Sequence, residues 1–172
     1  MHGLCLFRRR KYLGLIEGPA VNNNDVLRSL RYILDYNDAK MARISGLAGG
    51  TADQAEMEAM LKHEDEEGFK ECGNKELTRF LDGLIIHRRG LSDRTQPEGG
   101  RTPSLNNNLI LKKLRIAFKL QEQDMIRTFK KADFDISGTE LTAFFRKRGH
   151  KHYRECGDQL LKRFLKGLSI KE

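Results

Sequence analysis

The chain has 172 residues and a mass of 19.8 kDa, and 38% of its residues are hydrophobic and 33% charged. This length allows one domain or two small ones. The mean hydropathy is -0.61 and no run of about 18 apolar residues occurs, which excludes a typical membrane-spanning helix and predicts a soluble protein. The formal net charge of +8 permits a polyanionic partner.

The first 21 residues form an N-terminal extension to the pattern that follows. Its short apolar start runs directly into Arg8-Arg9-Arg10-Lys11, which is the wrong order of charge for a secretory signal. The three cysteines, Cys5, Cys72 and Cys156, are far apart and odd in number, so a disulfide framework is not expected. We therefore expect a cytoplasmic protein.

An internal repeat organises the rest of the chain. A shift of 84 residues aligns Asn22-Asn23-Asn24 with Asn106-Asn107-Asn108, and the register then holds without a gap. Further along, Glu71-Cys72-Gly73 recurs as Glu155-Cys156-Gly157. About a third of the paired positions are identical, where chance gives on the order of a twentieth, so the sequence predicts a duplicated supersecondary unit.

The repeat boundaries divide the chain into four segments, and the two repeats differ in the sign of their net charge. The extension (1–21) precedes an acidic repeat one (22–89), a flexible linker rich in Gly, Pro and Ser (90–105) and a basic repeat two (106–172). Repeat one has 10 basic and 13 acidic residues, whereas repeat two has 16 basic and 8 acidic residues.

Each repeat is predicted to contain four helices, which makes the fold all-α. The first follows an Asn N-cap, with apolar residues spaced along one face, and the second covers about residues 38–47 and 122–131. The third begins at the capping patterns Asp53-x-x-Glu56 and Ser137-x-x-Glu140. The fourth opens after Gly73-Asn74 and Gly157-Asp158, with Asn74 and Asp158 as the expected N-caps.

Several of these segments resemble the bacterial YehS-like family, a family of unknown function. The resemblance rests on Asn-Asn-Asp-Val-Leu-Arg at 23–28, the Glu-Cys-Gly and Phe-Leu-Asp-Gly-Leu-Ile-Ile segments of repeat one, the Asn run of repeat two and its ending from Gly149 to Gln159. It covers about residues 22–170 and implies no catalytic residues. Members of the family usually begin directly before the Asn run, so either Val21 is the true start, encoded by GTG, or the basic extension is authentic.

The loop between the third and fourth helices carries most of the charge difference between the repeats. It reads Lys-His-Glu-Asp-Glu-Glu-Gly-Phe-Lys at 62–70 and Arg-Lys-Arg-Gly-His-Lys-His-Tyr-Arg at 146–154. One interpretation is contact with DNA or RNA phosphates, with base stacking on an aromatic ring. The other is a protein-directed or structural charge, as in an interaction adaptor. The candidate nucleic-acid residues are Lys112, Lys113, Lys130, Lys131, Arg146, Lys147, Arg148, His150, Lys151, Tyr153 and Arg154.

The second and third helices of each repeat form a hairpin that resembles a helix-turn-helix. The connection between them is longer than the usual turn, and the third helix of repeat one carries Asp53, Glu56 and Glu58, which phosphates would repel. An ordinary hairpin packed inside a four-helix unit is the alternative. Any DNA contact is expected to come from repeat two.

Enzymatic chemistry, cofactors and metals are not expected. The chain has no nucleophile elbow, phosphate-binding loop or paired zinc-protease histidines. His150, His152 and Cys156 have ligand-like spacing but lack a fourth ligand, and the repeated cysteine is more simply a packed core thiol.

Three arginines recur in both repeats, which solvent exposure alone does not require. One interpretation is a local salt bridge, for example from Arg79 to Glu76 or Asp82, although repeat two has Leu160 and Lys166 at those positions. The other is a backbone-carbonyl or anion contact made by each repeat. The pairs are Arg31 and Arg115, Arg43 and Arg127, and Arg79 and Arg163.

Overall fold

A computed structural model describes residues 20–91 and 104–170, and the regular secondary structure of these ranges is entirely helical. The basic run at 8–11 and most of the expected linker lie outside the described residues. No helix in the described part of the chain is long and apolar enough to cross a membrane. The predicted all-α fold is confirmed.

Eight helices in the described ranges follow the duplication. Repeat one contains α2 (Asn23–Leu34), α3 (Asp38–Gly46), α4 (Gln54–Leu61) and α5 (Asn74–Arg89). Repeat two contains α6 (Asn107–Ala117), α7 (Glu122–Lys131), α8 (Gly138–Ala143) and α9 (Asp158–Ser169). Each helix of repeat two begins 84 residues after its counterpart, so the prediction of two tandem four-helix repeats is confirmed.

Side-chain caps begin the first and third helices of both repeats, as predicted. The side chains of Asn22 and Asn106 accept hydrogen bonds from backbone N–H groups in the first turns of α2 and α6. Asp53 and Ser137 do the same for α4 and α8. These bonds satisfy N–H groups that have no partner within the helix, which is why the polar residues recur at these positions.

The predicted caps of the fourth helices were wrong by one position. The N-cap residues are Gly73 and Gly157, which have extended backbone and make no side-chain cap hydrogen bond. Asn74 and Asp158 are instead the first helical residues. The Asp158 carboxylate accepts a hydrogen bond from the backbone N–H of Val21 at 3.3 Å, so it ties α9 to the segment that precedes α2.

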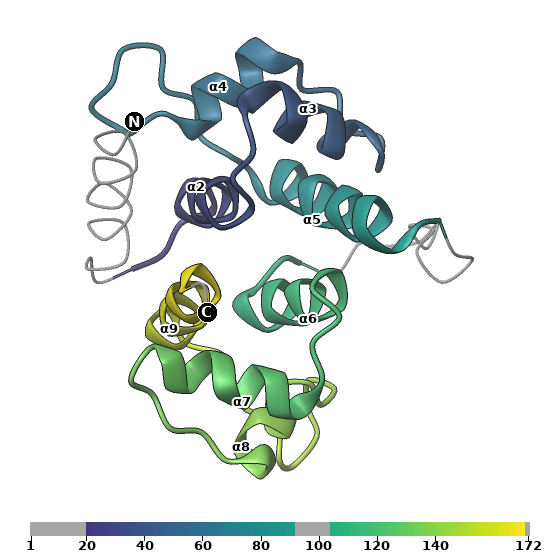
Figure 1. The fold of residues 1–172 in the computed structure, drawn as a ribbon, viewed down its shortest axis with the longest axis vertical. Coiled ribbons are helices and arrows are strands. Elements are labelled where there is room, and N and C mark those ends of the chain that lie inside the picture. The colour runs from purple at the N-terminus through teal and green to yellow at the C-terminus, as the bar shows by residue number, and fades with distance from the viewer. Residues whose placement is uncertain (1–19, 92–103, 171–172) are drawn as a thin grey trace. The chain divides into compact units, whose positions relative to one another are not determined.

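The compact units of the structure differ from the sequence repeats. The split unit combines residues 20–35 with 122–170, and the central unit comprises residues 36–91 and 104–121. Within the split unit α2 packs against α9, and within the central unit α6 packs against α5 (Figure 1). Each unit therefore contains the first helix of one repeat and the last three helices of the other.

The chain leaves the first helix of each repeat through the same backbone turn. Asp35 and Lys119, which are 84 residues apart, both adopt the left-handed conformation, with φ of 53° and 56°. Non-glycine residues rarely adopt this conformation. Asp35 directly precedes Tyr36, where the chain enters the central unit, and Lys119 lies three residues before Glu122, where the chain returns to the split unit, so equivalent turns lie at or near both crossings.

Two equivalent glycines let helix backbones touch inside the units. A Cβ atom added at Gly83 of α5 would lie 1.9 Å from the carbonyl oxygen of Ile44 in α3. A Cβ atom at Gly167 of α9 would lie 1.9 Å from the carbonyl oxygen of Thr128 in α7. Both glycines are buried, so any larger residue must push the two helices apart.

Replacing either glycine by alanine is expected to destabilise its unit. Because the added methyl group meets backbone rather than a movable side chain, we expect Gly83→Ala and Gly167→Ala each to lower the free energy of unfolding by about 2–3 kcal/mol. Urea denaturation followed by circular dichroism measures this change. Gly46→Ala is the control, since nothing lies within 4 Å of its added Cβ; equal losses at all three positions would contradict the packing argument.

Candidate nucleic-acid interface

The helical hairpin of each repeat is part of a packed unit. α3 packs against α4, and α7 packs against α8. The connections cover residues 47–53 and 132–137, longer than the three or four residues usual in a DNA-binding helix-turn-helix. α4 buries three apolar side chains and α8 has only 6 residues. The hairpins therefore differ from a DNA-binding helix-turn-helix, and the charged loops that follow them are the better candidates for a binding site.

The two charged loops have the same backbone hydrogen bonds. We call residues 62–70 the acidic loop and residues 146–154 the basic loop. The last residue of each donates its backbone N–H to an alanine of the preceding helix, from Lys70 to Ala59 at 3.0 Å and from Arg154 to Ala143 at 3.2 Å. Two inner bonds also correspond, Glu66 to His63 with His150 to Lys147, and Phe69 to Glu66 with Tyr153 to His150. The duplication has therefore kept the backbone pattern while the charge has reversed.

The basic loop presents most of its charged side chains to solvent. Arg146 and Tyr153 are partly buried, and the Nε atom of Arg146 is buried. The Tyr153 ring thus has only part of its surface available for stacking. The guanidinium of Arg148 lies 4.0 Å from the Glu155 carboxylate, and both side chains are at least three-quarters exposed, so this pair neutralises little charge. The exposed residues are Lys147, Arg148, His150, Lys151, His152 and Arg154.

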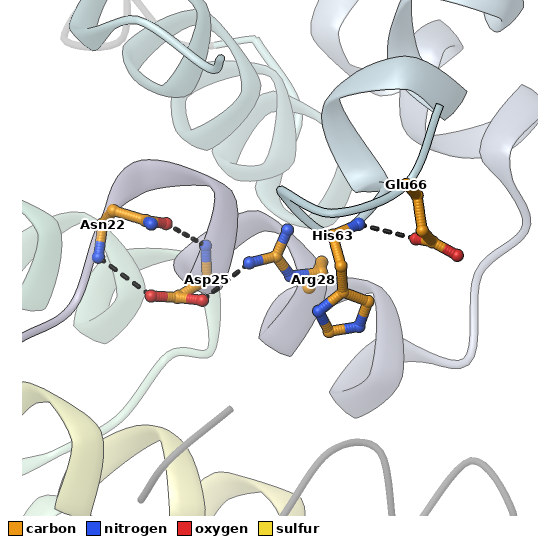
Figure 2. Close-up of polar contacts among 5 residues, drawn as sticks. All are labelled: Asn22, Asp25, Arg28, His63 and Glu66. Atoms are coloured by element: carbon orange, nitrogen blue, oxygen red, sulfur yellow. Dashed lines mark hydrogen bonds and ion pairs between the residues drawn. The ribbon is translucent and has the colours of Figure 1, made fainter. Parts of the chain in front are cut away.

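The acidic loop uses part of its charge internally. The backbone N–H of His63 donates to the Glu66 carboxylate at 2.6 Å, as Figure 2 shows, and Lys62 Nζ donates to the Glu67 carbonyl oxygen at 2.9 Å. Lys70 pairs with Glu56 of α4, and this hydrogen bond raises the pKa of the Lys70 ammonium. Glu64 and the two residues after it remain exposed, so the loop keeps an acidic surface.

The other candidate lysines divide between the two units. Lys130 is exposed and Lys131 is partly buried in the last turn of α7, so both belong to the split unit with the basic loop. Lys112 and Lys113 of α6 belong to the central unit. Lys113 forms an ion pair with Asp82 of α5. Its charge therefore contributes to the packing of α6 on α5 rather than to ligand binding.

Two buried basic residues did not stand out in the sequence. Arg28 of α2 is 8% exposed and pairs with Asp25 at 2.7 Å, while Asp25 and Asn22 exchange capping hydrogen bonds, as Figure 2 shows. The counterpart of Arg28 is the exposed Lys112, so the same register position is structural in one repeat and exposed in the other. Lys162 of α9 is 2% exposed. Burial depends on which helix packs nearby, and no local pattern in the sequence reports it.

The repeated arginines do not share one contact. Arg163 Nη1 donates to the carbonyl oxygen of Ala132 at 3.0 Å, as the carbonyl hypothesis predicts, and Arg115 Nε donates to that of Leu120 at 3.3 Å. In the described ranges Arg79 has no bond matching that of Arg163. Arg127 instead pairs with Asp124, whose counterpart in repeat one is Lys40, so the exposed Arg43 cannot form that pair. Arg31 lies partly buried in the last turn of α2.

The repeated cysteines are packed thiols in equivalent environments. Cys72 and Cys156 are 2% and 4% exposed, and the Sγ of each lies 3.8 Å from the carbonyl oxygen of the following glycine. Burial raises the pKa of both thiols to about 12. Around His150 and His152, as elsewhere in residues 20–91 and 104–170, no three potential metal ligands gather.

These features define the class as an all-α protein of two tandem four-helix repeats that exchange their first helices. A family model described as "Protein of unknown function (DUF1456)" matches residues 23–90 and 107–172. The chain therefore belongs to the DUF1456 family. It is 43% identical over 150 residues to the "Uncharacterized protein YehS" of Escherichia coli (strain K12), a match that covers 87% of this chain and 96% of that protein. No solved structure matches the chain. The resemblance predicted from the sequence motifs is confirmed.

The two buried thiols are expected to resist alkylation in the folded protein. With a pKa of about 12, roughly one thiol in ten thousand is ionised at pH 8, and burial also blocks access. Iodoacetamide treatment at pH 8, followed by mass spectrometry of peptides containing Cys72 and Cys156, should show modification only after unfolding. Rapid labelling of either residue in the native protein would contradict this assignment.

Replacing the repeated arginines Arg79 and Arg163 is expected to affect the two repeats differently. Arg163→Gln removes the bond to the Ala132 carbonyl and should lower the free energy of unfolding by about 1 kcal/mol, whereas Arg79→Gln should change it by less than about 0.5 kcal/mol. Chemical denaturation of both variants measures the difference. Equal destabilisation would show that Arg79 has a contact equivalent to that of Arg163.

Proposed function

We propose that the protein is a non-enzymatic binding protein that contacts the phosphates of nucleic acid through the basic loop. The supporting observation is the pair of loops with the same backbone bonds and opposite charge. Five of the nine positions in the basic loop are Arg or Lys, which gives a dense positive charge for phosphate contacts. The acidic loop provides an internal comparison, because it has the same hydrogen-bonded frame and would repel phosphates.

The exposed charges of the basic loop suit a backbone contact better than base recognition. Lys147, Arg148, Lys151 and Arg154 are all exposed, and arginine and lysine both pair well with phosphate oxygens. Binding of this kind releases counterions, so affinity falls steeply with salt. Because Tyr153 is partly buried, stacking on its ring is limited, and we expect the charges to supply most of the binding free energy.

A second candidate function is a protein-interaction adaptor. The observation that favours it is the exposed acidic stretch Glu64-Asp65-Glu66-Glu67, which suits a basic protein surface. A pull-down from lysate with and without nuclease separates the two functions. One protein partner at fixed stoichiometry that survives nuclease favours the adaptor, whereas nucleic acid retained by the protein favours phosphate binding.

Neutralising the basic loop is expected to weaken nucleic-acid binding and to reduce its salt dependence. In Lys147→Gln/Arg148→Gln/Lys151→Gln, three phosphate contacts are lost, so the slope of log K against log salt should decrease in magnitude by about 2–3. Fluorescence anisotropy with a labelled 30-mer duplex DNA and a single-stranded RNA, between 50 and 200 mM salt, measures both quantities and compares the two polymers.

The matched control removes the same charge from the central unit. Arg43→Gln/Lys75→Gln/Lys119→Gln replaces three exposed basic residues and lowers the net charge equally. This variant should retain most of the slope. Equal losses in the two variants would mean that net charge alone, and not the basic loop, attracts the nucleic acid, and the proposal would then fail.

A further inference from the structure

The apolar surfaces of the duplicated helices do not distinguish one docking partner from the other. Leu27 and Leu30 of α2 recur as Leu111 and Leu114 of α6, and all four are buried. The receiving helices also match, since Leu77, Phe80 and Leu81 of α5 recur as Leu161, Phe164 and Leu165 of α9. Either first helix would bury a similar stripe on either repeat, yet the structure pairs α2 with α9 and α6 with α5.

The net charges of the segments do distinguish the partners. Residues 106–121, which contain α6, have four basic and no acidic residues. They pack with the remainder of repeat one, residues 36–91, which has 8 basic and 11 acidic residues. The remainder of their own repeat, residues 122–170, has 11 basic and 7 acidic residues, which would repel them. The α2 segment, residues 22–35, is neutral, with two of each.

The contacts of α6 on α5 depend on residues that the two repeats do not share. Lys113 Nζ pairs with the Asp82 carboxylate, and the side chains are only 15% and 29% exposed. Arg88 Nε donates to the Ala117 carbonyl oxygen at 3.0 Å, and the Arg88 guanidinium lies 4.8 Å from the centre of the Phe118 ring. Arg89 adds a bond of 3.3 Å to a carbonyl oxygen of the same helix end.

The corresponding positions of repeat two would oppose the same docking. The counterpart of Asp82 in α9 is Lys166, so α6 placed on α9 in this register would bring Lys113 against a second ammonium group. α2, which does pack on α9, has Ser29 in place of Lys113 and avoids that repulsion. Attraction in one pairing and repulsion in the other is how charged groups usually create specificity between similar partners.

We propose that the charges of Asp82, Lys113 and Lys166 determine which of the two duplicated first helices docks on each repeat. In the exchange between repeats, burial of the shared apolar stripe therefore stabilises docking, and the charges that the repeats do not share select which first helix docks on which repeat. This inference concerns the assembly of the two units and does not depend on the proposed nucleic-acid contact.

The test transposes the charges in the full chain. Asp82→Lys/Lys166→Asp leaves the net charge unchanged but makes α5 repel α6 and α9 attract it. The reporter is an engineered cysteine pair, Arg89→Cys with Ile116→Cys, in which Cys5 is replaced by Ser and a short bismaleimide joins neighbouring thiols. Arg89 and Ile116 are in contact in the structure, so the intramolecular cross-link reports α6 on α5.

We expect the transposed variant to lose at least threefold in cross-link yield. The inverted variant Asp82→Lys/Lys113→Asp/Lys166→Asp restores attraction on α5 and repulsion on α9, so its yield should match that of the native charges. Glu58→Lys/Lys130→Glu, which transposes two exposed residues elsewhere, should also leave the yield unchanged. An undiminished yield in the transposed variant would overturn the proposal.

Stability decides the case if the transposed variant does not fold. Asp82→Lys alone should lower the urea midpoint of the chain, because it places two like charges between α5 and α6. The inverted triple variant should recover most of that shift. A triple variant as unstable as Asp82→Lys would show that these charges do not choose the helix, whatever the cross-linking result.

Discussion

Docking of a first helix on the last helix of the other repeat is the contact on which both compact units depend. α2 and α6 are amphipathic helices whose apolar stripes would be exposed alone, and isolated helices of 11 or 12 residues are marginal in water. Each stripe is buried against an apolar stripe supplied by α9 or α5. The remaining contacts, including the backbone approaches at Gly83 and Gly167, fix how the last three helices of each repeat present that surface.

The two repeats share their backbone features but differ in their charged side chains. The caps, the left-handed turns at Asp35 and Lys119, the close glycine contacts and the loop hydrogen bonds recur 84 residues apart, because they satisfy backbone groups and backbone groups are the same in both copies. Charged side chains on those frames were free to differ. This difference has two consequences. The acidic and basic loops face solvent with opposite charge, and Lys113 of α6 forms an ion pair with Asp82 of α5.

The helices and the repeat were predictable because their signals are local. Asn22, Asp53 and Ser137 are caps whatever packs nearby, and apolar spacing identifies each buried face. The fourth helices were misplaced by one residue, since glycine followed by Asn74 or Asp158 suits either cap assignment. The exchange of first helices was not predicted, because two nearly identical stripes leave the choice to an ion pair between residues 31 positions apart. For the same reason the burial of Arg28 and the pairing of Lys113 were missed.

Because of the exchange, the two units can be completed at different times during synthesis of the chain. The central unit is assembled from residues that follow one another, so it is complete once α6 has been synthesised. The split unit joins Val21 to Asp158, 137 positions later, and a ribosome needs roughly 7–27 s to synthesise that length of chain. During this interval α2 has no α9 to cover its apolar stripe. Closing so long a loop also carries a larger entropy cost than closing the central unit. Among the described helices α2 is thus made first, yet α9 can cover it only after the residues of the central unit have all been made.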